Sequence, residues 1–235
     1  PRICIECSEG IKGEASPVEW DFLCGECARG LRGFDATHAC SCCGVPVYGD
    51  LSQPITCGVC KESPPRWGRF FALTRYAGVS KRWVRDYKFH DARYLERDFR
   101  KLIGAKSSEL SAFLANALLV PVPLHPLKEF LRGFNQSERL AKLLLEVSPT
   151  CAYEAQLLRR TRYTRQQAKL KRRERQKNVK KAFDINRKMP LDTLQSRRVV
   201  VVDDLLTTGS TVSACVQALK DAGFTTVDVL TFARV

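Results

Sequence analysis

Four pairs of cysteines, each with two residues between its members, occupy the first 60 residues and limit how this part of the chain folds. The pairs are Cys4/Cys7, Cys24/Cys27, Cys40/Cys43 and Cys57/Cys60. Two thiolates at this spacing grip one metal ion while backbone amides stabilise the sulfur charge, and two such pairs complete a tetrahedral site. The eight ligands therefore predict two structural zinc ions, because four sulfur ligands leave no position open for water.

The sequence alone leaves several interpretations of these cysteines open. Gaps of 16 and 13 residues, within residues 7–24 and 43–57, suit two consecutive zinc ribbons, but a cross-braced pairing would use the same ligands. Nine cysteines precede residue 61. A disulfide framework would need an oxidising compartment and would leave one of the nine unpaired. Redox catalysis by one CxxC pair is another hypothesis, but the presence of four such pairs in succession makes it less favoured than metal binding. The ninth, Cys42, could replace a neighbour, although only Cys40 and Cys43 have the ligand spacing.

The cysteine-rich segment has few large apolar residues with which to build a core. The main candidates are Trp20, Phe22, Leu23, Leu31 and Phe34. Metal binding should therefore supply much of the folding energy of this segment. Pro64 and Pro65 mark its end, so we expect a double zinc-ribbon module at 1–66 and a second domain at 67–235.

The second domain alternates strand and helix patterns. Phe70–Tyr76 and Leu118–Val122 read as strands, with helical material over Val79–Ile103 between them and a helix at Asn135–Glu146 after them. A final unit follows, with a β-branched run at 199–202, a helix that stops at Gly223 and a strand at 227–232. This order predicts an α/β fold with a parallel sheet and a ligand site at the carboxyl ends of its strands.

Asp203 and Asp204 follow that β-branched run and are succeeded by a hydroxyl-rich loop. Its residues are Thr207, Thr208, Gly209, Ser210 and Thr211. Neighbouring carboxylates can accept hydrogen bonds from a ribose diol, and a glycine-containing loop that opens a helix favours a phosphate. The combination points to a sugar phosphate. Neither GxxxxGK[ST] nor GxGxxG occurs. The alternative without a ligand is that the acids only cap the next helix.

At this point the sequence is similar to a known family. Val199 to Thr211 resembles the phosphoribosyl-pyrophosphate signature of type I phosphoribosyltransferases. Further matching pieces are Val120-Pro121-Val122-Pro123-Leu124, Arg132-Gly133-Phe134-Asn135-Gln136, Arg162, Thr164, Gln167, Leu170, Arg175, Asn178 and Ala182-Phe183. With the zinc module, they resemble the ComF family, specifically the ComFC competence proteins and the similar GntX proteins, over essentially the whole chain.

The resemblance implies a five-stranded phosphoribosyltransferase-like domain. Asp203 and Asp204, as the catalytic pair, would hold the ribose hydroxyls, and Thr207 to Thr211 would surround the 5′-phosphate of phosphoribosyl pyrophosphate (PRPP). The loop after Val122 would face the pyrophosphate, with Mg²⁺ as the bridging ion. Purine-salvage members usually carry an acid at the position of Thr207, so purine salvage is not expected here.

The net charge of +14 is concentrated in one segment. Residues 159–188 hold fourteen basic residues against two acidic ones, with Tyr163 and Phe183 among them. Cations around a stacking residue can bind single-stranded nucleic acid. The candidate residues are Arg159, Arg160, Arg162, Arg165, Lys169, Lys171, Arg172, Arg173 and Arg175. The same segment could instead be an active-site hood over pyrophosphate, or a solvated charged helix, although that helix would repel itself.

The sequence thus leads to two functional hypotheses. The first is a ComF-type protein that assists natural transformation by binding single-stranded DNA and PRPP; the second is an active phosphoribosyltransferase with an unidentified acceptor. In a weaker third reading, the zinc ribbons dock a DNA-uptake helicase or channel protein. No stretch reaches the roughly 20 apolar residues of a membrane-spanning helix, so we expect a cytoplasmic protein, at most peripheral to the inner face of the membrane.

Overall fold

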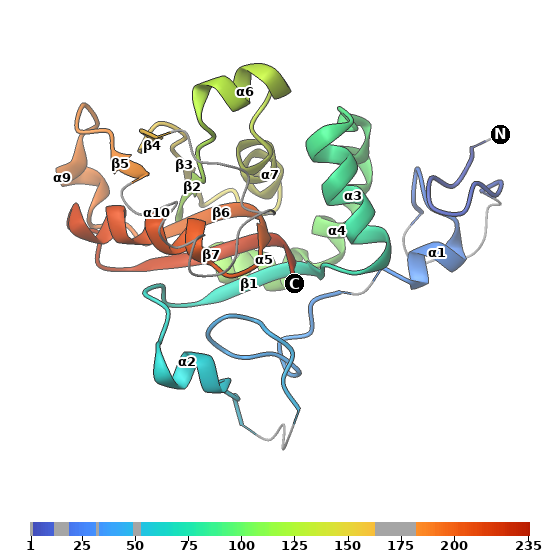
Figure 1. Cartoon of the computed structure of the whole chain (residues 1–235), viewed down its shortest axis with the longest axis horizontal. Coiled ribbons are helices and arrows are strands. Elements are labelled where there is room, and N and C mark those ends of the chain that lie inside the picture. The colour runs from blue at the N-terminus through green and yellow to red at the C-terminus, as the bar shows by residue number, and fades with distance from the viewer. Residues whose placement is uncertain (1, 12–18, 32, 49–52, 163–181) are drawn as a thin grey trace.

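The computed structural model describes residues 2–11, 19–31, 33–48, 53–162 and 182–235. At its centre lies a five-stranded sheet in the order β1-β7-β6-β2-β3, and every neighbouring pair is parallel. These strands are β1 (Phe70–Arg75), β2 (Leu118–Pro121), β3 (Ala152–Tyr153), β6 (Val199–Leu206) and β7 (Val227–Arg234). The predicted α/β class with a five-stranded parallel sheet is confirmed (Figure 1).

Strand β6 lies in the middle of the sheet because its side chains suit burial on both faces. The four valines 199–202 are fully buried, and the strand pairs with β2 on one side and β7 on the other. β-Branched residues of this kind favour a pleated backbone covered on both faces. The strand continues beyond the predicted valines to Leu206, so Asp203 and Asp204 lie within its carboxyl end.

Helices cover both faces of the sheet. Val200 and Val202 pack into one core and Val199 and Val201 into another, because successive strand residues point to opposite faces. The first core is shared with α3 (Gly78–Phe89), α4 (Glu96–Ala105), α5 (Ser107–Leu114) and α7 (Gln136–Leu145). The second is shared with α9 (Leu191–Leu194) and α10 (Ser210–Asp221).

Some elements differ from the sequence-based prediction. The expected helical stretch Val79–Ile103 is interrupted between α3 and α4 by a 3₁₀ turn at Arg93–Leu95, preceded by Asp91 at a φ of 48°. The sequence pattern did not reveal α5, α9 or β3. It also missed α1 (Gly25–Arg29), α2 (Gly58–Glu62), α6 (Pro126–Arg132) and the antiparallel pair β4 (Leu158–Arg160) and β5 (Phe183–Ile185). Among the described residues, no helix is both long and apolar enough to cross a bilayer.

The two halves of the cysteine-rich segment contact different parts of the second domain. In the first half, Trp20 and Leu23 join the core of α3 and α4. In the second, Phe34 meets Phe70 of β1 edge to face at 5.7 Å. Figure 1 shows α1 on the side of α3 and α4, and α2 below β1. The expected separate small core is therefore wrong for Trp20 and Leu23, because so short a segment buries large side chains better against a neighbouring core.

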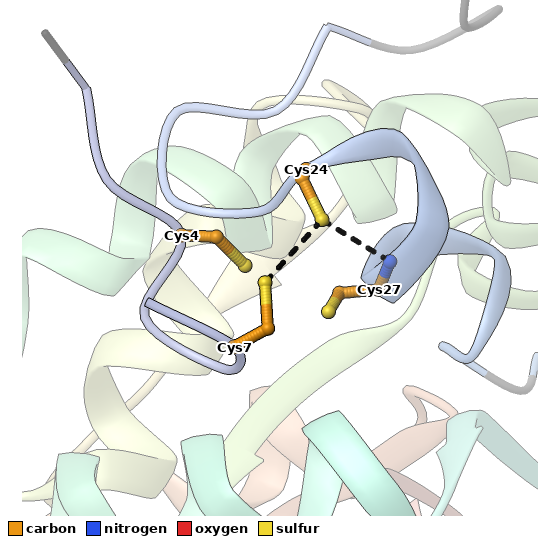
Figure 2. Close-up of side chains that lie close together, drawn as sticks. All are labelled: Cys4, Cys7, Cys24 and Cys27. Atoms are coloured by element: carbon orange, nitrogen blue, oxygen red, sulfur yellow. Dashed lines mark hydrogen bonds between the residues drawn. The ribbon is translucent and has the colours of Figure 1, made fainter. Parts of the chain in front are cut away.

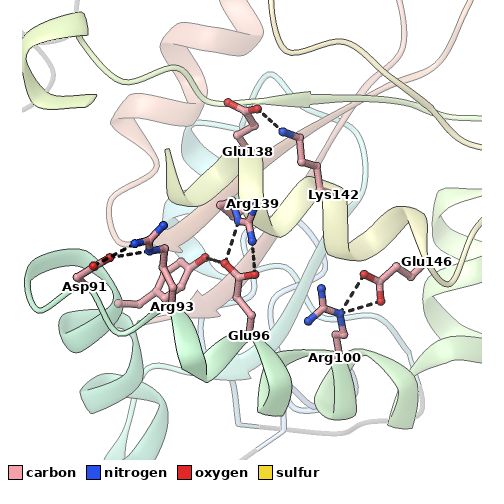
Figure 3. A network of polar contacts seen from close by, with 9 residues as sticks. Asp91, Arg93, Glu96, Arg100, Glu138, Arg139, Lys142 and Glu146 are labelled. Carbon is pink, nitrogen blue, oxygen red and sulfur yellow. Dashed lines mark hydrogen bonds and ion pairs between the residues drawn. The ribbon is translucent and has the colours of Figure 1, made fainter. Parts of the chain in front are cut away.

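A buried carboxylate joins three helices on the α3 side of the sheet. Glu96, 5% exposed, accepts hydrogen bonds from the Tyr87 hydroxyl at 2.6 Å and from two nitrogens of Arg139 at 2.9 and 2.6 Å. Burial acts to raise the pKa of Glu96, but the bonds from Arg139 and Tyr87 outweigh it and lower that pKa. Figure 3 shows this network beside three pairs that do not include Glu96, among them Arg100 with Glu146.

This network predicts a stability contrast between two glutamates. We expect Glu96→Ala to lower the free energy of unfolding by about 3 kcal/mol, because it leaves Arg139 and Tyr87 without their buried acceptor. We expect the matched control Glu146→Ala to cost less than about 0.5 kcal/mol, because that ion pair is half exposed. Urea unfolding of both variants measures the difference. Equal losses would show that Glu96 is not a structural anchor.

Candidate functional site

The eight predicted metal ligands gather into two clusters. The first cysteine cluster is Cys4, Cys7, Cys24 and Cys27, and the second cysteine cluster is Cys40, Cys43, Cys57 and Cys60. Within each cluster the sulfur atoms lie within 4.8 Å of one another, and Figure 2 shows the four side chains of the first turned toward a common centre. The structure therefore pairs consecutive CxxC units, and a cross-braced arrangement is excluded.

The sulfur geometry fits tetrahedral zinc. The Cys7 and Cys24 sulfurs are 3.7 Å apart, and those of Cys43 and Cys57 are 3.9 Å apart. Zinc–sulfur bonds of about 2.3 Å give a tetrahedron with edges of about 3.8 Å. All eleven cysteines lie in described ranges, and none forms a disulfide. The two clusters thus support two structural zinc ions, each of which would fix the fold around its four thiolates.

Backbone amides prepare the thiols for a metal, as the sequence suggested. The Cys57 amide donates to the Cys40 sulfur at 3.3 Å. Burial acts to raise the pKa values of Cys4 and Cys40, but amide donors outweigh it and lower them to about 7 and about 6. The pKa values of Cys7, Cys27, Cys43 and Cys60 are instead raised, with burial and neighbouring thiols acting in that direction. Since zinc binds thiolates, the lowering favours metal binding through one ligand of each cluster, Cys4 and Cys40.

The acid pair sits at the carboxyl end of β6, where Asp203 is buried and the Asp204 side chain is 15% exposed. Asp203 is 9% exposed, and its Oδ1 accepts from the Ser137 hydroxyl at 3.0 Å and from the Asp204 amide at 2.9 Å. The Asp204 Oδ2 lies 2.6 Å from the ammonium of Lys88 on α3. A ligand that uses both carboxylates would have to draw Lys88 away from Asp204.

Asp203 has an unusual pKa for an aspartate. Burial is the largest cause, followed by the negative charge of Asp204; together they raise the pKa of Asp203 to about 7, against the opposing effects of Lys88, the Asp204 amide and Ser137. The carboxyl therefore keeps its proton to a higher pH than an ordinary aspartate does. Such a shift, produced by burial and a like charge, is common in functional sites.

The loop Thr207–Thr211, which we call the phosphate loop, leads into α10. Gly209 adopts a φ of 74° and precedes the first turn of this twelve-residue helix, and the hydroxyls of Thr208 and Ser210 lie 2.9 Å apart. The first amides of a helix have no intrahelical acceptor and, with the helix dipole, favour an anion. Residues 207–210 line a cavity of about 1120 Å³, and Thr211 follows in the helix.

The acids and the phosphate loop face different spaces, although they are close in the chain. Asp204 lines a separate small cavity of about 20 Å³ with Tyr87 and Gln136, room for about one water molecule. Neither Asp203 nor Asp204 lines the larger cavity beside the phosphate loop. The structure thus places both predicted groups at the same sheet edge without joining their cavities.

The sequence suggested a role beside PRPP for Arg160 alone, as part of a hood over pyrophosphate, but the structure groups four cations near the acids. Lys88 of α3, Arg132 of α6 and Arg160 of β4 each interact with a carboxylate of the acid pair, and Lys128 of α6 is the fourth. Burial and then repulsion by Arg160 and Arg132 lower the pKa of Lys128. Burial also lowers the pKa values of Arg132 and Arg160, while the charges of Asp204 and Asp203 respectively act to raise them. This basic cluster concentrates positive charge where an anion would be stabilised.

The segment 132–137 positions part of this site, and its residues explain how. Gly133 ends α6 with a φ of 79°, and the Asn135 side chain accepts from the Ser137 amide at 3.0 Å, which caps α7. The same side chain donates to the Val122 carbonyl at 3.1 Å. The turn therefore brings Arg132 and Ser137 to the acid pair. The Arg-Gly-Phe-Asn-Gln run was the available sequence signal, but it did not assign these roles.

The predicted nucleic-acid residues are only partly described by the structure. Arg159 and Arg162 are exposed, and Arg160 is half-buried with its guanidinium 5.2 Å from the centre of the Phe183 ring. The remaining six lie outside the described residues: Arg165, Lys169, Lys171, Arg172, Arg173 and Arg175. The described part of the segment thus offers two of the candidate residues, Arg159 and Arg162, as exposed cations, and Arg187 and Lys188 after β5 are exposed as well.

Comparison with known proteins gives a consistent set of relatives. The chain is 33% identical over 230 residues to the DNA utilization protein YhgH of Salmonella typhi, and 31% identical over 215 residues to the same protein of Escherichia coli K12, with 90% of each chain covered. It is 25% identical over 240 residues to competence protein F of Haemophilus influenzae, covering 98% of this chain and 96% of the relative. No family model matches the chain.

The cluster assignment predicts a zinc stoichiometry. We expect two zinc ions per chain, two in Cys42→Ser and one in Cys43→Ser, because the Cys42 sulfur belongs to neither cluster. Metal analysis of the purified proteins, with chelator titration, measures this. Loss of one zinc from the Cys42 variant would overturn the assignment.

The raised pKa of Asp203 predicts a pH-dependent stability difference. The folded protein holds this proton more tightly than an unfolded chain, whose aspartates titrate near 3.8, so the wild type loses stability as the pH rises from about 4 to about 7. Asp203→Asn has no proton to lose, and its amide oxygen can accept both hydrogen bonds. We expect the variant to gain on the order of 2 kcal/mol over wild type between pH 5 and pH 8.

Urea unfolding at several pH values measures this gain. The matched control is Asp192→Asn, an exposed aspartate of α9, which should show no comparable trend. A stability difference for Asp203→Asn that stays constant or shrinks with rising pH would contradict the assignment.

Proposed function

Because this chain belongs to the ComF family, together with the DNA utilization protein YhgH and competence protein F, we propose that it assists natural transformation in the cytoplasm by binding single-stranded DNA and PRPP. The observation that carries the PRPP part is one sheet edge with an acid pair, a helix-opening phosphate loop and a basic cluster. The DNA part rests on the family and on the concentrated positive charge.

Each chemical group of PRPP has a suitable partner at this edge of the sheet. The ribose hydroxyls would donate to Asp203 and Asp204, and the 5′-phosphate would accept from the phosphate loop. The pyrophosphate would lie among Lys88, Lys128, Arg132 and Arg160, and an anion there would relieve the repulsion of Lys128 by Arg160 and Arg132. Mg²⁺ would supply charge neutralisation between pyrophosphate and carboxylate oxygens, which are ligands it prefers. Lys88 would exchange Asp204 for a phosphate oxygen as the ligand enters.

Single-stranded DNA fits features that lie next to this edge. Phe130 of α6 and Phe89 at the end of α3 are 84% and 58% exposed, and the Arg132 guanidinium lies 5.6 Å from the centre of the Phe89 ring. Exposed rings among cations provide stacking platforms for bases, while cations neutralise phosphates. Arg159 and Arg162 extend the positive charge toward the rest of the basic segment.

A second candidate is an active phosphoribosyltransferase, favoured by the pKa of Asp203. A carboxyl that titrates near 7 could exchange a proton with a nitrogenous acceptor while the pyrophosphate group leaves the ribose. In this case, pyrophosphate release from PRPP would depend on an acceptor and would disappear in Asp204→Asn. The docking of a helicase or channel partner on the zinc module is a weaker proposal, which deletion of residues 1–66 followed by an assay of complex formation would test.

Calorimetric titration with PRPP and Mg²⁺ tests the proposed site. We expect binding by wild type, and at least about tenfold weaker binding by Asp204→Asn, because a charge-assisted contact to the ribose is lost. The exposed Asp192→Asn is the matched control and should bind normally. No binding of PRPP to the wild type would remove the proposal.

A short single strand, titrated with and without PRPP, tests the DNA part. Neutralisation of Arg159, Arg162, Lys171, Arg172 and Arg173 to Gln should weaken binding and reduce its salt dependence, because fewer counterions are released. The matched control neutralises five exposed cations elsewhere: Arg2, Arg29, Arg97, Arg100 and Lys220. Equal affinities of the two variants would exclude the basic segment. Competition by PRPP would indicate that both ligands share one site.

A further inference from the structure

The second cysteine cluster and the phosphate loop lie on the same cavity. Cys43, Cys57 and Cys60 line it from one side, and residues 207–210 line it from another. Two buried side chains, Arg234 and Trp67, line it as well and reach from the cluster to the loop. These contacts suggest that metal binding at the cluster and the conformation of the loop are not independent.

Arg234 makes the more direct connection. It lies at the end of β7, is 7% exposed, and donates to the Cys43 carbonyl while another of its nitrogens lies 3.9 Å from the Cys43 sulfur. Its Nη1 donates to the carbonyls of Leu206 and Thr207, both at 3.1 Å, and also to Val235 O. One guanidinium therefore holds a metal ligand and the first residue of the phosphate loop together.

Trp67 makes the second connection, on the other side of the loop. Its indole N–H donates to the Cys42 carbonyl at 2.7 Å, within the turn between two ligands of the cluster. Its ring packs against Gly209, where an added Cβ would lie 3.0 Å from the ring edge. Because Gly209 has a φ of 74° and begins α10, this contact fixes the point at which the loop becomes helix.

The charge of Arg234 explains why the metal state of the cluster would affect the loop. Its guanidinium contacts four carbonyl oxygens, and among the described residues the one side chain to which it donates is that of Cys43, whose sulfur lies 3.9 Å away. A buried cation is costly unless an anion is near. Four thiolates around one Zn²⁺ carry a net negative charge, so the loaded cluster supplies the counter-charge that keeps Arg234 in place.

We propose that Arg234 and Trp67 are positioning residues that couple the second cysteine cluster to the phosphate loop. Metal at this cluster then holds the loop in its ligand-binding conformation. The functional part of this inference rests on the proposed phosphate-binding role of the loop. The first cysteine cluster lacks this role: its module is attached at α4, where Asp98 accepts from the amides of Asp21 and Phe22 at 2.6 and 3.1 Å.

The two clusters provide matched variants within one chain. Cys60→Ser removes a ligand from the second cluster and Cys7→Ser one from the first, and each should cost one zinc ion. With ribose 5-phosphate as the calorimetric probe, we expect Cys60→Ser to weaken binding about tenfold or more and Cys7→Ser to stay within about twofold of wild type. Equal effects of the two variants, or a larger effect of Cys7→Ser, would refute the coupling.

A readout without ligand separates failure of the coupling from failure of the proposed function. Hydrogen exchange of the amides of residues 208–212 should accelerate in Cys60→Ser and not in Cys7→Ser, whether or not wild type binds ribose 5-phosphate. If wild type does not bind the probe but exchange responds as expected, the coupling stands and the phosphate-binding role falls. Unchanged exchange in Cys60→Ser overturns the coupling.

Arg75 provides a matched control for Arg234. It donates to the Gly44 and His38 carbonyls at 3.1 and 3.3 Å, so it also attaches the module of the second cysteine cluster to the sheet. We expect Arg234→Gln to accelerate loop exchange and weaken ribose 5-phosphate binding about tenfold, and Arg75→Gln to leave both nearly unchanged. Arg234→Lys should recover part of the affinity because it restores the charge. A similar loss in the Arg75 variant would reduce Arg234 to a general structural contact.

Coupling between two binding sites is reciprocal, which gives a last independent test. Saturating ribose 5-phosphate should slow the transfer of one of the two zinc ions to a chelator, and this protection should be absent in Arg234→Gln. Equal release rates with and without the probe, in a protein that binds it, would contradict the coupling.

Discussion

The pairing of β6 with β7 is the interaction on which the site and its attachment to the zinc module depend. In its register Asp203 lies opposite Thr231 and Leu206 lies opposite Arg234. The same ladder of hydrogen bonds therefore brings the acid to the sheet edge and places a guanidinium where the phosphate loop begins. Since side chains alternate along a strand, a slip of one residue would turn these groups to the opposite faces. Complete burial of the four valines on β6 makes such a slip costly.

The site combines groups whose charges would be unfavourable alone. Asp203 is a buried carboxyl beside a second acid, and Lys128, Arg132 and Arg160 repel one another at its rim. Lys88 partly compensates the acid pair, because its ammonium lies 2.6 Å from Asp204 Oδ2. Such an arrangement costs stability, as groups that are placed for binding often do. The acid pair and the cations come from β6, α3, α6 and β4. Several elements of the domain together therefore hold these groups in their unfavourable positions.

The two cysteine clusters have the same ligand set but attach to different parts of the fold. Each supplies local order to a segment that has too few apolar side chains to fold alone. The first is attached to α3 and α4 through Trp20, Leu23 and the acceptor Asp98, far from the phosphate loop in the fold (Figure 1). The second is attached beside the loop through Trp67 and Arg234. The difference lies in what each module contacts and not in its ligands.

The sequence alone determined the features that depend on local spacing: the eight metal ligands, the central β-branched strand, the acid pair and the helix-opening loop. These could be predicted because each depends on residues a few positions apart. The fold was required for the pairing of the cysteines, for the ion pair of Lys88 with Asp204, and for the grouping of Lys88 with Lys128, Arg132 and Arg160 in the basic cluster, because these residues are distant in the chain. The raised pKa of Asp203 needed it too, since burial depends on what packs above the strand. Only the tertiary structure placed Arg234 between a metal ligand and the phosphate loop, since strand register and module docking decide that together.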